Sequence, residues 1–177
     1  VMLAGWSSGS KYPLLGAVRA SAQMISYEAA LGLSVLAVVL MSRSLSTHQM
    51  VLDQAGPGGA LGDWSAPNWN IIATGLVPFI VFLIAATAEL NRPPFDLVEA
   101  EQELVGGFQT EYSSIRFGMF YVAEFMNTVT MSAIIVTLFL GGPAGPALLG
   151  PGWLWGIIWF LAKMFIFLFM FVWFRAT

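Results

Sequence analysis

Cysteine is absent from this chain of 177 residues, and histidine occurs only once, at His48. Disulfides within the chain and cysteine-ligated iron–sulfur clusters are therefore excluded. A single histidine without a companion also argues against a histidine-based metal or haem site. If electrons move in the system to which this chain belongs, another subunit must carry them.

Charge is scarce as well: Asp, Glu, Lys and Arg make up 10% of the residues, whereas 58% are hydrophobic. The mean hydropathy is +0.77. A soluble domain of this length has no interior large enough to bury so much apolar surface, so the sequence predicts an integral membrane protein. Seven tryptophans and four tyrosines, several near the ends of apolar runs, fit anchoring at the membrane interfaces.

Motifs for bond-breaking catalysis are also missing. The sequence has no nucleophile–base pair and no metal-ligand spacing, and its glycine-rich pieces lack the lysine and the strand–helix context of a nucleotide motif. We therefore expect no catalytic residue, no metal and no nucleic-acid partner in this chain. It starts at Val1 and stops at Thr177 directly after an apolar run, so we expect a fragment of a longer protein.

Four apolar runs approach the length of about 20 residues that a membrane-crossing helix needs. They span residues 20–42, 71–88, 117–140 and 153–174. Because their apolar character is continuous and does not alternate as in a strand, we expect helices rather than a barrel. The predicted fold is an all-α integral membrane protein. It forms a single membrane domain of four transmembrane helices with a long acidic cytoplasmic loop at residues 89–116.

Lysine and arginine are distributed unequally between the two sides of these runs. One side carries Arg43 alone, and the other side carries the remaining loop cations, namely Lys11, Arg19, Arg92, Arg116 and Arg175. The positive-inside rule places the second side in the cytoplasm. The acidic loop then faces the cytoplasm, and residues 44–70 and 141–152 form outward connectors.

Acidic residues gather where they are costly. The window from Glu89 to Glu124 holds seven of the ten acidic residues of the chain, and Glu28 lies within the first apolar run. Carboxylates inside membrane spans usually mark functional paths, and a carboxyl group removed from water can exchange a proton near neutral pH. We expect Glu28, Glu89 and Glu124 to line one polar path. The alternative for Glu28 is a structural role, neutralised by Arg19 or by interfacial water.

Lys163 lies near the middle of the last apolar run. It could extend its side chain to the membrane surface, but the distance from the centre is long for one side chain. We therefore expect it to pair with a carboxylate and to belong to the same polar path.

The acidic loop begins as a turn and continues as a short helix. Pro93 and Pro94 end the preceding helix, and Asp96 followed by Glu99 resembles a helix start with a capping acid. Glu99 and Glu103 would share one helical face, with Glu101 nearly opposite. A solvated acidic helix is the simpler interpretation, but the apolar residues between the acids favour contact with a partner.

Four stretches carry a close family resemblance: Gly5–Tyr12, Leu15–Glu28, Glu89–Tyr112 and Ala123–Asn127. Their order and spacing resemble the H-type membrane subunit (subunit 1 in mitochondria) of proton-translocating NADH:quinone oxidoreductase, respiratory complex I. The similarity extends along essentially all of the chain. Leu90 and Phe125 depart from the family pattern, and each removes a hydroxyl group beside one of the glutamates.

The resemblance implies a role for most of the polar residues. In this family the acidic loop contacts the peripheral arm and helps to form the quinone chamber, and the glutamates begin a proton path toward antiporter-like subunits. The chamber and coupling loop would comprise Arg19, Arg92, Asp96, Glu99, Glu101, Glu103, Glu111 and Arg116. The proton path would comprise Glu28, Glu89, Glu124 and Lys163.

The resemblance also implies where the redox chemistry lies. The chain would be a non-cofactor subunit, inactive alone, of an enzyme that reduces quinone with NADH and pumps protons. NADH, flavin and iron–sulfur clusters would be held by partner subunits, and quinone would be the substrate. The chain would lie among membrane lipid as a multi-pass protein of the inner membrane of a bacterium.

Three alternatives remain at this point. The first is the homologous subunit of a membrane-bound hydrogenase or of a ferredoxin- or deazaflavin-linked dehydrogenase. The second, from a different class, is an ion channel or secondary transporter whose acids line its own pore. The third is a structural anchor in which the acids are inert.

The charge distribution predicts the topology directly. Cysteines introduced at Gly58 and Gly145 should react with a membrane-impermeant thiol reagent from the periplasmic side, and a cysteine at Gln102 from the cytoplasmic side. The measurement is labelling in intact cells against labelling in inverted membrane vesicles. Labelling of Gln102 from outside in intact cells would reverse the orientation.

Overall fold

The computed structural model describes residues 1–55, 68–91, 95, 111–146 and 152–176. This part of the chain contains helices and connecting segments and no strand, which confirms the predicted all-α class. The helices are α1 (Met2–Ser7), α2 (Lys11–Ser42), α3 (Thr47–Gln54), α4 (Asn70–Ala73), α5 (Leu76–Glu89), α7 (Ile115–Phe139) and α8 (Gly152–Ala176). Among the described residues, α2, α7 and α8 are long and apolar enough to cross a membrane.

Helix α2 is the longest element, with 32 residues. Pro13 is tolerated because it lies in the first turn, where a backbone N–H has no partner within the helix. The helix ends at Arg43, whose φ of 52° is the left-handed conformation that commonly terminates helices. At 32 residues it exceeds the length that a bilayer requires, so it extends beyond the hydrocarbon at one end or lies tilted.

The second predicted crossing, at residues 71–88, is divided between two helices. Gly75 has a φ of 80°, a conformation that is easy for glycine, and it separates α4 from α5. Helix α5 has 14 residues. At 1.5 Å per residue this is about 21 Å, which is shorter than a hydrocarbon core of about 30 Å.

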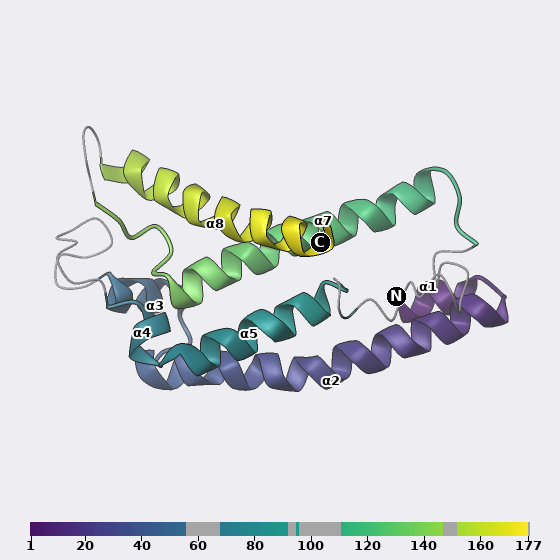
Figure 1. Ribbon diagram of the computed structural model, residues 1–177, viewed down its shortest axis with the longest axis horizontal. Coiled ribbons are helices and arrows are strands. Elements are labelled where there is room, and N and C mark those ends of the chain that lie inside the picture. The colour runs from purple at the N-terminus through teal and green to yellow at the C-terminus, as the bar shows by residue number, and fades with distance from the viewer. Residues whose placement is uncertain (56–67, 92–94, 96–110, 147–151, 177) are drawn as a thin grey trace.

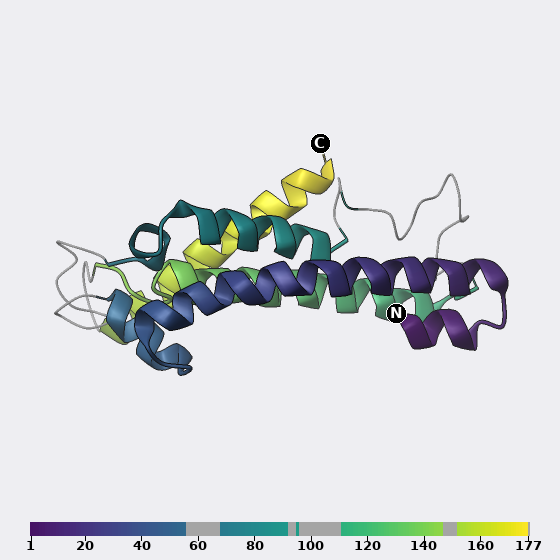
Figure 2. The same ribbon diagram turned by 90° about the horizontal axis from the view of Figure 1, so that it is seen from below.

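The arrangement is elongated, with α5 lying along α2 in both views (Figures 1 and 2). Helices α7 and α8 pack against each other, and their aromatic residues meet those of α5. The ring centroids of Phe79 and Phe139 are 5.4 Å apart, and those of Phe82 and Phe139 are 5.5 Å apart. Phe171 of α8 is fully buried in the same cluster. Leu90 also belongs to this core, which explains an apolar residue beside Glu89.

The end of the bundle that holds α3, α4 and the C-terminus of α7 is called the outward end, after the predicted topology. Gln54 is 1% exposed there, and its Nε2 donates to the backbone oxygen of Thr137 at 3.1 Å. Its Oε1 accepts the backbone N–H of Asn70 (3.2 Å) and of Gly141 (2.9 Å). Asn70 Nδ2 donates to Leu138 O at 2.9 Å. Two side-chain amides thus bind α3, α4 and α7 together.

Most of the remaining surface is apolar. Large exposed side chains include Leu40, Phe165, Ile166 and Trp173, each at least 60% exposed. Surface of this extent and composition is what lipid or partner helices cover. The sequence and the fold therefore agree on an integral membrane protein.

The fold changes one detail of the labelling experiment. A Cβ atom added at Gly145 would lie 2.5 Å from the Trp159 ring, so a cysteine there would displace that ring. Gly145 is thus a poor position for an introduced cysteine, and the labelling experiment depends on the cysteines at Gly58 and Gln102. Both of these residues lie outside the described part of the chain.

Candidate functional site

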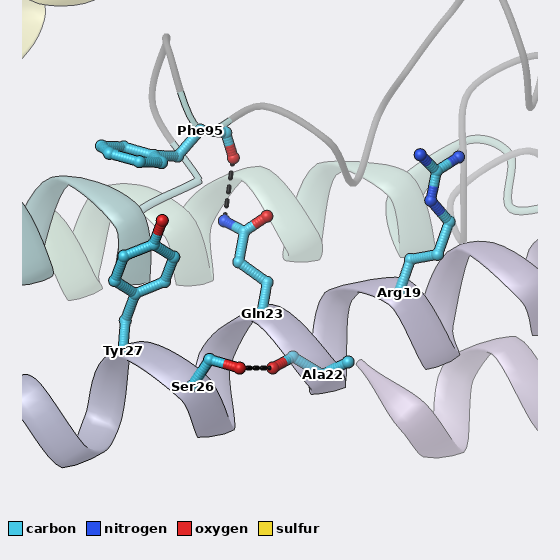
Figure 3. Close-up of a pocket in the computed structure, with 6 residues that line it drawn as sticks. All are labelled: Arg19, Ala22, Gln23, Ser26, Tyr27 and Phe95. Carbon is cyan, nitrogen blue, oxygen red and sulfur yellow. Dashed lines mark hydrogen bonds between the residues drawn. The ribbon is translucent and has the colours of Figure 1, made fainter.

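One face of α2 forms a pocket of about 420 Å³ near the end of α5. Its lining residues follow the helical repeat: Arg19, Ala22, Gln23, Ser26 and Tyr27, closed from above by Phe95. Figure 3 shows the side chains of Arg19, Gln23 and Tyr27 rising from α2 toward the segment that carries Phe95. The pocket thus joins a membrane helix to the start of the acidic segment.

The side chain of Gln23 holds α2 to the end of α5 and to the segment that carries Phe95. It is 9% exposed, and its Nε2 donates to Phe95 O at 2.8 Å and to Ala88 O at 3.0 Å. Asn91 Oδ1 lies 3.4 Å from the same nitrogen. The Tyr27 and Phe95 rings add an edge-to-face contact with centroids 5.1 Å apart. Phe95 is therefore anchored on α2, and it marks one end of the acidic segment.

Glu28 and Glu89 are brought together by the packing of α5 on α2. Glu89 is half-buried at the last residue of α5, and Glu28 is exposed on α2. The Glu28 carboxyl group lies within electrostatic range of the Glu89 carboxyl group.

Glu124 occupies a half-buried position on α7. The Thr128 hydroxyl donates to its backbone oxygen at 2.9 Å. Helix α7 approaches α2 at the level where Phe120 packs against Ala17 and Ala20. Whether Glu124 continues the path from the other two glutamates stays a prediction.

Glu111 and Arg116 line a second pocket of about 550 Å³ with residues of α1 and of the start of α7. Between them, Tyr112 holds the other end of the acidic segment. Its hydroxyl donates to Ala4 O at 2.8 Å and lies 2.7 Å from Ser7 Oγ, and its ring packs edge-to-face on Phe120 at 5.1 Å. The acidic segment thus runs between two aromatic anchors, Phe95 and Tyr112.

Five of the predicted site residues fall within or beside that segment, at positions that lie outside the described residues. They are Arg92, Asp96, Glu99, Glu101 and Glu103. Within the part of the chain that the structure does describe, no group of three or more His, Cys, Asp or Glu residues could hold a metal ion.

Lys163 contacts backbone oxygens and not the expected carboxylate. Its Nζ donates to Leu140 O (2.8 Å), Gly142 O (3.1 Å) and Ala144 O (2.7 Å), and it lies 5.3 Å from the centre of the Trp69 ring. Three carbonyls use all three donors of an ammonium group. The expectation of a carboxylate partner was therefore wrong for the described chain: the end of α7 supplies partial negative charge in its place.

Sequence reasoning overlooked the buried amides Gln23, Gln54 and Asn70. Gln23 lies within the first apolar run, where an uncharged amide must also find partners, and that requirement was an available signal. Gln54 and Asn70 lie in residues 44–70, which were interpreted as a connector.

The NADH dehydrogenase family model matches residues 1–177. The chain is 51% identical to an H-type subunit of the NADH-quinone oxidoreductase of Geobacter sulfurreducens over 177 residues. It is 51% identical over 183 residues to the corresponding subunit of Frankia alni, and 47% identical over 181 residues to that of Deinococcus radiodurans. The three alignments cover all of the chain but 46%, 37% and 44% of these relatives. The family resemblance is thereby confirmed, and the chain spans less than half the length of these relatives.

The contacts of Lys163 predict that its replacement damages the fold before it affects proton movement. In Lys163→Met, three carbonyls lose their donor, each at a cost of about 1–3 kcal/mol. We expect the full-length subunit carrying this change to accumulate in membranes at a small fraction of the normal amount, and any assembled complex to aggregate at a lower temperature. Lys11→Met, at an exposed lysine, is the control. Normal amounts and thermal stability, combined with lost proton pumping, would instead place Lys163 in the proton path.

Proposed function

The chain belongs to the NADH dehydrogenase family, and from this we propose that it is part of the H-type membrane subunit of a proton-translocating NADH:quinone oxidoreductase, respiratory complex I. The observation that carries the proposal is about 50% identity, along the entire chain, to relatives named as that subunit. These relatives are bacterial, so the chain is assigned to a bacterial inner membrane as a multi-pass protein.

In this proposal the pocket between α2 and Phe95 forms part of the wall of the quinone chamber. Aromatic and apolar groups line it together with a cation, Arg19, and an amide, Gln23. Ligand pockets combine apolar walls with a few polar groups in this way, at volumes of roughly 300–1,000 Å³. Quinone reduction takes up two electrons and two protons, and in this proposal the electrons come from cofactors on partner subunits.

The protons are linked to the neighbouring glutamates. Glu28 and Glu89 lie on the adjoining helices α2 and α5 near the pocket, where they would exchange protons with the quinone site. Glu124 on α7 and Lys163 on α8 would carry the path toward antiporter-like membrane subunits. The contacts of Lys163 give the weakest support, because they serve the backbone of the outward end.

The acidic segment would couple the two processes. Its acids, Asp96, Glu99, Glu101 and Glu103, lie between the anchors at Phe95 and Tyr112, with Arg92 before the first anchor and Glu111 and Arg116 around the second. Like charges beside a quinone resist the negative charge that reduction brings, and taking up protons relieves that repulsion. The peripheral-arm subunits of the quinone module would cover this segment.

The homologous subunit of a hydrogenase or of a ferredoxin- or deazaflavin-linked dehydrogenase is the nearest rival. Purification of the full-length protein with its partners separates the two, since we expect subunits carrying flavin and iron–sulfur clusters, with NADH-dependent quinone reduction in the purified complex. Hydrogen evolution without NADH oxidation would favour the hydrogenase. Proton conduction by the full-length protein alone in lipid vesicles would favour a channel or transporter.

The proton path has its own test in the intact complex. Glu28→Gln, Glu89→Gln and Glu124→Gln each remove a proton-exchanging group with little change of shape. Positioned proton-transfer groups typically contribute roughly 100-fold or more, so we expect quinone reduction and proton pumping to fall together, by roughly tenfold or more. Asp53→Asn, at an exposed acid on α3, is the matched control. Wild-type pumping in all three variants, with normal assembly, would leave these glutamates a structural role only.

A further inference from the structure

One buried polar atom in the pocket lacks a partner. Gln23 Oε1 is shielded from solvent and accepts no hydrogen bond from the residues that the structure describes. The same side chain lines the pocket of about 420 Å³ with Arg19, Tyr27 and Phe95. In Figure 3 its oxygen points away from Phe95 and toward the side of the pocket where Arg19 lies.

The orientation of this amide follows from its surroundings. Ala88 O, Phe95 O and Asn91 Oδ1 surround one end of the carboxamide, at 3.0, 2.8 and 3.4 Å. All three are acceptors, so the nitrogen must face them and the oxygen must face the pocket. Turning the amide over would set an oxygen against two backbone oxygens and lose every bond.

A buried acceptor without a donor destabilises the site until a donor reaches it. The Gln54 amide shows the contrast within the same chain, because its oxygen accepts two backbone N–H groups. The unpartnered Gln23 oxygen accepts hydrogen bonds only, so it is suited to an occupant that presents a donor. A hydroxyl group of the occupant would satisfy it.

We propose that Gln23 Oε1 is a hydrogen-bond acceptor for a hydroxyl group of the reduced quinol, and that it makes this pocket distinguish quinol from quinone. The inference rests on the proposed function. An oxidised quinone ring carries two carbonyl oxygens and no donor, so it gains nothing from Oε1. The quinol carries two hydroxyl groups, one of which can donate to Gln23 while its ring lies beside the Tyr27–Phe95 ring pair.

The experiment separates the acceptor from the anchor that Gln23 also provides. Gln23→Lys keeps donors for Ala88 O and Phe95 O and removes the acceptor. Lys163 shows that three oxygens can hold an ammonium group in this chain. Gln49→Lys, at an exposed glutamine on α3, is the control for the added charge. Both variants are made in the intact membrane complex, and the KM for quinone and the inhibition constant of the matching quinol are measured.

In Gln23→Lys we expect the quinol inhibition constant to rise about fivefold to tenfold more than the KM for quinone, the range that one hydrogen bond supplies. An unchanged quinol constant, or a parallel rise in both, would overturn the proposal and leave Gln23 as an anchor. If the complex carrying Gln23→Lys fails to assemble, Gln23→Met is measured in its place. The test is again the rise in the quinol inhibition constant relative to the rise in the KM for quinone. If the wild-type complex reduces no quinone, the proposed function itself is wrong, and that result is distinct from an unchanged ratio.

Discussion

The backbone oxygens at the C-terminus of α7 must find donors inside an apolar environment, and the outward end of the molecule is organised by that requirement. The side chain of Gln54 donates a hydrogen bond to Thr137 O, that of Asn70 donates to Leu138 O, and that of Lys163 donates to Leu140 O. Each donor comes from a different segment: α3, α4 and α8. The hydrogen bonds of one helix end therefore fix the positions of three other elements. They also account for a lysine in the middle of an apolar helix that has no ion pair with the residues that the structure describes.

At the other end of the bundle, where Gln23 lies, a buried amide again binds backbone oxygens. There, however, one of its hydrogen-bonding atoms has no partner among the described residues. Gln23 closes the end of α5 and holds Phe95, as Gln54 closes the end of α7, but only the Gln54 oxygen finds donors within the described chain. A complete network stabilises one arrangement, whereas an open acceptor leaves room for a second partner. The contrast separates an end whose amide network is complete from an end that, in our proposal, takes a ligand, and Glu28 and Glu89 lie beside the latter.

The sequence was sufficient for the fold class, the membrane environment and the family, because these depend on apolar runs and long motifs. It could not predict the break at Gly75, since glycine is also tolerated within membrane helices. It misassigned the partner of Lys163 because a carbonyl group at a distant helix end has no signature in the sequence. Gln23, Gln54 and Asn70 were overlooked for the same reason: their partners lie up to 87 residues away. The roles of the acidic residues from Asp96 to Glu103 remain predictions, because these residues lie outside the described part of the chain.

The short α5 has an electrical consequence. A helix of about 21 Å that starts at one membrane surface ends within the hydrocarbon, about 9 Å before the other. Glu89 is its last residue. In the proposed topology, a proton that reached Glu89 from the cytoplasm would cross part of the transmembrane voltage, which amounts to about 2.3 kcal/mol per charge and 100 mV for the full distance. In the proposed proton path, proton loading at Glu89 would thereby be tied to the membrane potential, so that an energised membrane would oppose or assist loading before any proton passed to another subunit.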